Sequence, residues 1–151
     1  MHISAKVDYA VRALVALAAA NGGPLAGAAI AQSEALPAKF LEGILSELRR
    51  SSIVSSQRGA EGGFRLARPA RDISIADVIR ALDGPLAAVR GERPEKRPYE
   101  GASQHLQEVW IAVRANLRAV LENTTIADVA TGRLPAAVKR LAANPDAWQP
   151  H

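Results

Sequence analysis

Three glycines fall within five residues of the stretch QRGAEGGFRLAR, which runs from Gln57 to Arg68. On its two sides lie short segments typical of β-strands, Ile53–Gln57 and Gly63–Ala67. Glycine allows the positive φ angles and the close backbone approaches that a tight reversal requires. The pattern therefore predicts a β-hairpin with Gly59, Gly62 and Gly63 at its tip. Taken alone, such a stretch would be an ordinary turn, so the elements before it decide its meaning.

Helical patterns occupy the chain before this hairpin. Apolar residues at helical spacing predict a helix over residues 3–20, with Ser4 as its N-cap, and a small helix over residues 25–34. A second short helix follows from Pro37 to about Arg50, with Phe40 and Leu41 among the residues of its inner face. Two short helices with a tight break between them are typical of a helix-turn-helix, and a hairpin directly after it indicates a winged helix.

The second half of the chain carries fewer sharp signals. Ser74 and Asp77 predict a capping box that opens a helix ending at Asp83. Residues 84–102 are charged and rich in proline and glycine, which predicts a mobile loop. Ser103 is expected to open a long helix, and Thr125 to cap a short one over 126–130, followed by a tail over 133–151.

The long helix has more apolar surface than a small winged helix needs for its own core. We therefore expect it to form a homodimer, with packing inside one subunit as the alternative. The predicted fold is mainly α with a small β-hairpin wing, a winged helix-turn-helix over 1–83 and a dimerisation unit over 103–132. The residues expected at the dimer contact are Leu106, Val109, Trp110, Val113, Leu117 and Val120.

The positive charge is concentrated in one segment. The net charge of the chain is +4, and the window 39–71 alone holds four more basic than acidic residues. A localised basic segment in an otherwise neutral chain favours a polyanionic partner, nucleic acid above all. A solvated basic face remains the alternative at this point.

Several classes of function are disfavoured by composition. The chain has no cysteine, so disulfides, thiolate nucleophiles and cysteine-ligated iron-sulfur clusters are impossible. Its three histidines, His2, His105 and His151, have no catalytic spacing around them, and no phosphate-binding loop is present, so we do not expect an enzyme. The longest apolar run is too short to cross a bilayer, and we expect a cytoplasmic protein that does not bind membranes.

Three segments resemble the BadM or Rrf2 family of bacterial transcription regulators: MHIS with Lys6, Tyr9 and Ala10, then PAKFLEGILSELRRSSIVSSQRGAEGGFRLARP, then ISIADVIRALDGPL. The similarity runs from residue 1 to about 86 and is most specific in the wing. It implies a homodimeric winged helix that binds a two-fold symmetric operator and usually represses transcription. Many members hold an iron-sulfur cluster through three cysteines in the loop that corresponds to residues 84–105, and this chain has none there. His105 with Glu92, Glu95 and Glu100 would make a poor metal site, so no cofactor is expected.

The resemblance and the pattern together predict a sequence-specific, DNA-binding regulator, with a protein interaction module as the alternative. Lys39 and Glu42 would reach base edges in the major groove, where Glu42 can accept a hydrogen bond from cytosine N4 unless it is simply solvated. Arg58 and the wing glycines would meet the minor groove or its phosphates. The full set of residues expected at double-stranded DNA is Lys6, Tyr9, Pro37, Ala38, Lys39, Glu42, Arg58, Gly59, Gly62, Gly63 and Arg65.

The signal that controls such a regulator is left open by the sequence. A small molecule could bind between the long helix and the winged helix, a protein partner could bind the charged loop, or abundance alone could vary. The first of these is favoured, because a few degrees of change between two reading heads alters their spacing on DNA.

Overall fold

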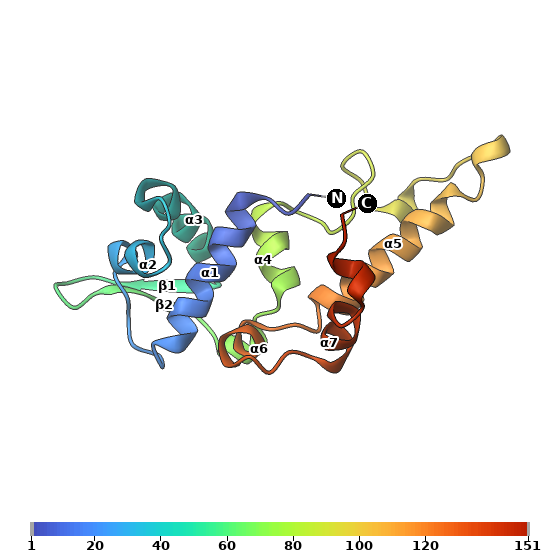
Figure 1. Cartoon of the computed structure of the whole chain (residues 1–151). Helices are drawn as coiled ribbons and strands as arrows, with labels where there is room; N and C mark the ends of the chain where they lie inside the picture. The colour runs from blue at the N-terminus through green and yellow to red at the C-terminus, as the bar shows by residue number, and fades with distance from the viewer. Residues whose placement is uncertain (1, 151) are drawn as a thin grey trace.

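The computed structural model describes residues 2–150. It places a helix-turn-helix and a two-stranded hairpin at one end of the molecule and a long helix at the other (Figure 1). The helices and strands in chain order are α1 (Ala5–Ala19), α2 (Gly27–Ser33), α3 (Ala38–Arg50), β1 (Val54–Gln57), β2 (Gly63–Leu66), α4 (Ile75–Leu82), α5 (Leu106–Leu121), α6 (Ile126–Thr131) and α7 (Ala136–Ala142).

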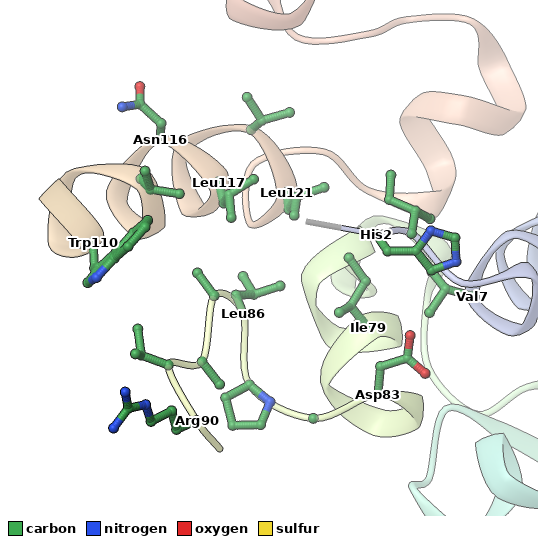
Figure 2. Close-up of a pocket in the computed structure, with 18 residues that line it drawn as sticks. His2, Val7, Ile79, Asp83, Leu86, Arg90, Trp110, Asn116, Leu117 and Leu121 are labelled. Atoms are coloured by element: carbon green, nitrogen blue, oxygen red, sulfur yellow. The ribbon is translucent and has the colours of Figure 1, made fainter. Parts of the chain in front are cut away.

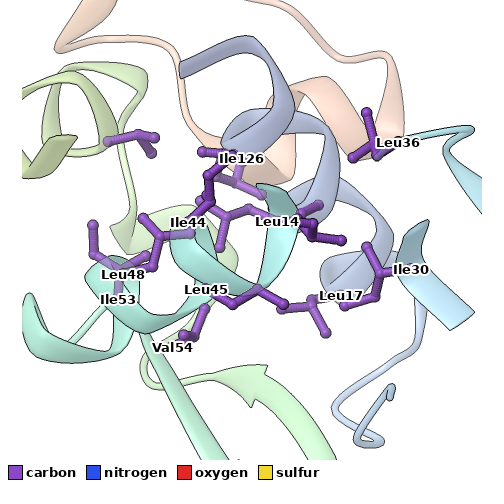
Figure 3. Packing of buried hydrophobic residues seen from close by; sticks show 14 of the residues in the cluster. Leu14, Leu17, Ile30, Leu36, Ile44, Leu45, Leu48, Ile53, Val54 and Ile126 are labelled. Carbon is purple, nitrogen blue, oxygen red and sulfur yellow. The ribbon is translucent and has the colours of Figure 1, made fainter. Parts of the chain in front are cut away.

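The hydrophobic core forms around α1 (Figure 3). Leu14 and Leu17 of α1 meet the inner face of α3, where Ile44 and Leu45 are fully buried. Each large apolar side chain buried in this way contributes about 1.5–3 kcal/mol to the free energy of folding. The apolar residues that repeat every three or four positions along α1 and α3 therefore determine how the two helices pack.

Three predicted helix starts are confirmed by their capping bonds. The Ser4 hydroxyl accepts a hydrogen bond from the backbone of Val7. Ser74 forms a reciprocal capping box with Asp77, and Thr125 forms one with Asp128. These bonds satisfy backbone N–H groups that the first turn of a helix leaves without a partner, which is why the signals are readable from sequence.

The structure differs from the expectations after residue 100. The long helix begins at Leu106 rather than Ser103, because residues 101–103 form a separate 3-10 turn whose Gly101 has φ of +62°. The expected tail contains α7 and a further 3-10 turn over 145–148. The helix α6 packs against α1, and its Ile126 is fully buried in the core of the winged helix.

One expected core residue lies elsewhere. Phe40 was predicted on the inner face of the second short helix, but it is 48% exposed. Its ring meets the edge of Tyr9 at a centroid distance of 5.8 Å. Phe40 occupies the position just before Leu41, so the helical turn carries it to the border of the buried face. Within residues 2–150, no helix has the length and hydropathy that a membrane span requires.

Candidate nucleic-acid interface

The exposed side of α3 carries polar side chains that have no partner within the described residues. Leu41, Ile44, Leu45 and Leu48 are buried on the other face. Lys39 and Glu42 are exposed, and their side chains make no hydrogen bond or ion pair with any residue between 2 and 150. They are three residues apart and so share one face of the helix. The exposed Pro37 is the N-cap, so Ala38 and Lys39 form the first turn.

The break between α2 and α3 is held from behind by α1. Ala35 takes a left-handed conformation with φ of +52°, and the buried Leu36 bonds back to the Ala31 carbonyl at 2.8 Å. The Arg12 guanidinium of α1 donates to the Glu34 carbonyl and lies 3.5 Å from its carboxylate. A cation placed at the C-terminal end of α2 also complements the helix dipole. The orientation of α2 is thus fixed by contacts inside the protein.

The hairpin carries a third backbone pairing beside its two strands. In the β1–β2 ladder Gln57 faces Gly63 and Ser56 faces Phe64. Phe64 also exchanges two backbone hydrogen bonds, of 2.9 and 2.7 Å, with Leu25. This bridge joins the wing to the segment that directly precedes α2.

Two wing glycines are required by these internal contacts. A Cβ atom on Gly63 would lie 2.4 Å from the Leu25 carbonyl oxygen, and one on Gly62 would lie 2.2 Å from that of Gln57. Gly59 has φ of +110° with open space around it. Glycine is therefore needed at 62 and 63 for packing and at 59 for conformation. Their predicted approach to DNA remains a prediction.

The arginines of the wing differ in freedom. Arg58 is exposed next to the tip and has no partner among residues 2–150. Arg65 is half-buried, and its Nη2 donates to the Gln57 side chain at 2.5 Å. Arg49 of α3 donates to the Ser56 hydroxyl at 3.3 Å and so ties the helix to β1. Arg58 is the guanidinium of this group that can turn to a ligand without breaking a bond.

Lys6 and Tyr9 are engaged inside the protein. The Lys6 ammonium lies 2.7 Å from the Glu47 carboxylate of α3 and 3.3 Å from the Leu82 carbonyl at the end of α4. Tyr9 packs on the core and on Phe40. To contact a phosphate, the Lys6 ammonium would have to divide its hydrogen bonds between the phosphate and Glu47. Among the residues expected at DNA, Lys6 is therefore the one already held by an ion pair.

Arg50, at the end of α3, lies in the basic window but outside the set of residues expected at DNA; it is exposed and has no partner among residues 2–150. Arg50 follows Lys39 by about three helical turns and so lies on nearly the same side of α3, which is the signal that could have included it. The surface formed by the outer face of α3 and the wing tip presents Lys39, Arg50 and Arg58 as free cations and Glu42 as a free carboxylate. Such a surface suits a polyanion with an embedded hydrogen-bond donor, as a DNA groove offers.

Comparisons with known proteins agree with this geometry. The family model described as "Rrf2: Iron-dependent Transcriptional regulator" matches residues 3–132. The chain is 51% identical over 143 residues to Rv1287 of Mycobacterium tuberculosis, which is named as an HTH-type transcriptional regulator. The aligned region covers 94% of this chain and 89% of that protein. It is 36% identical over 135 residues to the HTH-type regulator CymR of Bacillus subtilis, covering 87% and 91% of the two chains.

Solved structures give the same result. The structure of CymR, titled the global cysteine regulator of B. subtilis, matches with a TM-score of 0.75 and 34% identity over 87% of this chain and 98% of that one. The T. potens IscR structure matches with a TM-score of 0.70 and 31% identity over 88% of both chains.

The iron in that family description does not fit the donors of this chain. There is no cysteine to hold a cluster. Between residues 2 and 150, no group of three His, Asp or Glu side chains is close enough to hold a metal ion. His105, the one histidine of the loop over 84–105, has its ring beside the Gln104 amide at 3.1 Å. We therefore derive no role for iron here.

Proposed function

The chain belongs to the Rrf2 family of DNA-binding transcriptional regulators, and we propose that it acts as a cytoplasmic homodimer that binds a two-fold symmetric operator and represses transcription. The observation that carries this proposal is the unpaired polar face of α3 beside the exposed Arg58 of the wing. An enzymatic reading has no support in the family or in the relatives.

In this proposal α3 enters the major groove with its first turn. Pro37 and Ala38 allow close approach to the DNA backbone, and Lys39 can donate to guanine O6 or N7. Glu42 accepts a hydrogen bond from cytosine N4, because an acid near phosphates alone would be repelled. Arg58 reaches the adjacent minor groove, where the negative potential favours a guanidinium.

The long helix supports the dimer. None of the 16 residues of α5 is buried within the chain, and Val109 and Val113 are 51% and 41% exposed. An apolar groove of about 920 Å³ lies between α5, α4 and the loop after α4. Trp110, Leu117 and Leu121 point into it from the helix (Figure 2). A second copy of the chain would cover both this groove and the exposed stripe.

A dimer would place two reading heads side by side. Half-sites on one face of DNA are about 34 Å apart, one helical turn. Symmetry then requires that the operator be a palindrome whose two halves are read by identical residues. Lys6, Tyr9 and Arg65 are proposed at the flanking phosphates, where they fix the register of the head.

The test is selection of genomic DNA fragments by the purified protein, followed by a reporter assay with the enriched operator. We expect a palindromic motif and reduced reporter expression when the protein is present. Fragments enriched without a common motif would exclude sequence-specific recognition. Raised expression from a palindromic operator would exclude repression but not DNA binding. A protein that retains no DNA at all would instead be an interaction module.

A further inference from the structure

Four arginines from three separate parts of the chain converge on one pocket away from the DNA-reading end. Arg80 comes from α4, Arg93 from the loop, and Arg114 and Arg118 from α5. The pocket has a volume of about 490 Å³, and Gly84, Pro85 and Leu86 form the rest of its lining. We call these four side chains the arginine pocket.

The positive charge of the arginine pocket is only half compensated. Glu122 accepts from both Arg80 and Arg118, the latter at 3.0 Å, and Glu95 accepts from Arg114. Arg93 forms no ion pair with any residue between 2 and 150. Two carboxylates therefore face four guanidinium groups, which leaves an excess of two positive charges around one cavity.

The arginines of the pocket also keep the two carboxylates ionised. Hydrogen bonds from Arg80 and Arg118 lower the pKa of Glu122, and the hydrogen bond from Arg114 lowers that of Glu95. Both acids stay ionised at neutral pH and still leave the pocket cationic. Arg93 forms no ion pair among residues 2–150, so a structural role in these ion pairs does not account for its place in the pocket.

We propose that the arginine pocket binds a small oxyanion with at least two negative charges, and that this anion is the effector of the regulator. Guanidinium groups present paired N–H donors that match the oxygens of a phosphate or a carboxylate. The proposal rests on the proposed function, since an effector requires an operator-binding activity to modulate. It adds the chemical class of the ligand and its place in the fold.

The position of the pocket connects the two ends of the molecule. Arg80 belongs to α4, which packs on α1 and α3 of the winged helix, whereas Arg114 and Arg118 belong to α5. An anion bound by all three would fix the angle between α4 and α5. Gly84, Pro85 and Leu86 also line the apolar groove proposed for the second copy. Ligand binding and dimer geometry would therefore be coupled through one short segment.

The arginines of the pocket lie on a different side of α5 from the exposed apolar stripe. With 3.6 residues per turn, Arg118 lies roughly 140° around the α5 axis from Val113. The exposed apolar stripe and the arginine side of the helix thus face different directions. A second copy seated on the stripe would meet the arginine pocket only at Gly84, Pro85 and Leu86, which the pocket shares with the groove.

The test measures binding to the full-length protein without DNA. Pyrophosphate and citrate are titrated separately by calorimetry at constant ionic strength, with chloride as the reference anion. We expect a saturable heat with at least one of them and a rise in Tm of several degrees at saturation. The arm that binds tells whether the natural ligand carries phosphate or carboxylate groups. No heat beyond chloride with either anion would overturn the proposal.

Two variants locate the site. Arg93→Gln removes an exposed arginine without an ion pair and should weaken anion binding at least tenfold while the fold stays intact. Arg133→Gln, an exposed arginine between α6 and α7, is the matched control and should bind as the wild type does. Equal binding by wild type and Arg93→Gln would place the anion elsewhere and overturn the assignment.

Operator binding with and without the anion separates the two proposals. We expect the operator affinity of the wild type to change at least fivefold with saturating anion, and that of Arg93→Gln to remain constant. A saturable anion that leaves operator affinity unchanged would overturn the effector role. A protein that binds the anion but no DNA would contradict the proposed function and leave the anion site standing.

Discussion

The end that carries α3 and the wing buries most of its apolar side chains within one chain, whereas the end that carries α5 leaves its own apolar side chains partly exposed. The inner face of α3 is buried, and Lys39, Glu42 and Arg50 on its exposed side are polar and have no partner among residues 2–150. In α5 no residue is buried, and apolar side chains line both a groove and an exposed stripe. The difference indicates two kinds of missing partner: a polyanion at the first end and an apolar surface, such as a second copy of the chain, at the other.

Salt should separate the two ends most strongly. If each dimer neutralises several phosphates, each contributes about −0.9 to the slope of log affinity against log salt, so operator affinity should fall by up to about 10³-fold between 50 and 200 mM. Dimerisation through apolar residues should change little over the same range. Fluorescence anisotropy and sedimentation measure the two quantities. A slope near zero for DNA would remove the distinction.

A charge on the exposed stripe should break the α5 end alone. Val113→Glu would place a carboxylate in an apolar contact, and we expect the dimer dissociation constant to rise about 100-fold, or roughly 2.7 kcal/mol. Ile111→Glu is the matched control, since Ile111 is similarly exposed but lies on another side of the helix. Sedimentation equilibrium gives both values. Equal weakening by the two variants would mean that Val113 is not at the contact.

At the end that binds DNA, a substitution in α3 should reduce base specificity, whereas a substitution in the wing should reduce affinity for most sequences. Glu42→Ala should relax the choice of one base per half-site by about 1–3 kcal/mol, because a base-edge bond is lost. Arg58→Ala should weaken binding to most sequences and reduce the preference for A·T-rich flanks. Selection of bound sequences with each variant makes the comparison. An unchanged motif with Glu42→Ala would show that Glu42 is a solvated carboxylate.

Gly43 tests whether a side chain can be added to the exposed side of α3 without loss of stability or DNA binding. Gly43 lies on the exposed side of α3, and a Cβ there would meet nothing within 4 Å. Gly43→Ala should raise the free energy of unfolding by about 0.5–1 kcal/mol, because glycine inside a helix is unfavourable. Urea denaturation measures this. A simultaneous loss of operator affinity would show that DNA approaches the helix at this point. A lower free energy of unfolding would contradict the prediction that a Cβ at position 43 meets no other atom.

Iron should make no difference at either end. Because the chain has no cysteine, we expect freshly purified protein to be colourless and its operator binding to be unchanged by chelators, oxygen or nitric oxide. Absorbance between 300 and 600 nm and metal analysis test this. A stoichiometric iron signal would show that other side chains hold a cofactor.

What could be predicted from sequence is what depends on neighbours in the chain. Ser74 and Asp77 bond to each other within one turn. The spacing of three and four positions between Leu41, Ile44 and Leu45 defines the buried face of α3 directly. The winged helix was therefore predicted in its order and approximately in its bounds. The start of α5 differs from the expectation because residues 101–103 form a separate 3-10 turn that begins at Gly101, and α7 gives no sequence signal because it is short and none of its residues is buried.

The candidate site divides in the same way. Lys39 and Glu42 could be placed on an outer face from helical spacing alone. The pairing of Lys6 with Glu47, the contact of Gly63 with Leu25 and the arginine pocket join residues far apart in the chain. In the sequence, Arg80 and Arg93 look like solvated charges, since nothing local indicates that α4 and the loop meet the same side of α5.

The bridge between Leu25 and Phe64 fastens the wing to the start of α2. Its two backbone hydrogen bonds fasten the hairpin to the residue that leads into the helix-turn-helix. Together with the Arg49–Ser56 bond between α3 and β1, the bridge restrains the position of the wing relative to the helix-turn-helix in the protein without DNA. We expect a duplex whose groove width matches this arrangement to bind without rearrangement, and one with a different groove width to be deformed on binding. We therefore expect binding to depend on the shape of DNA also at positions that no side chain touches.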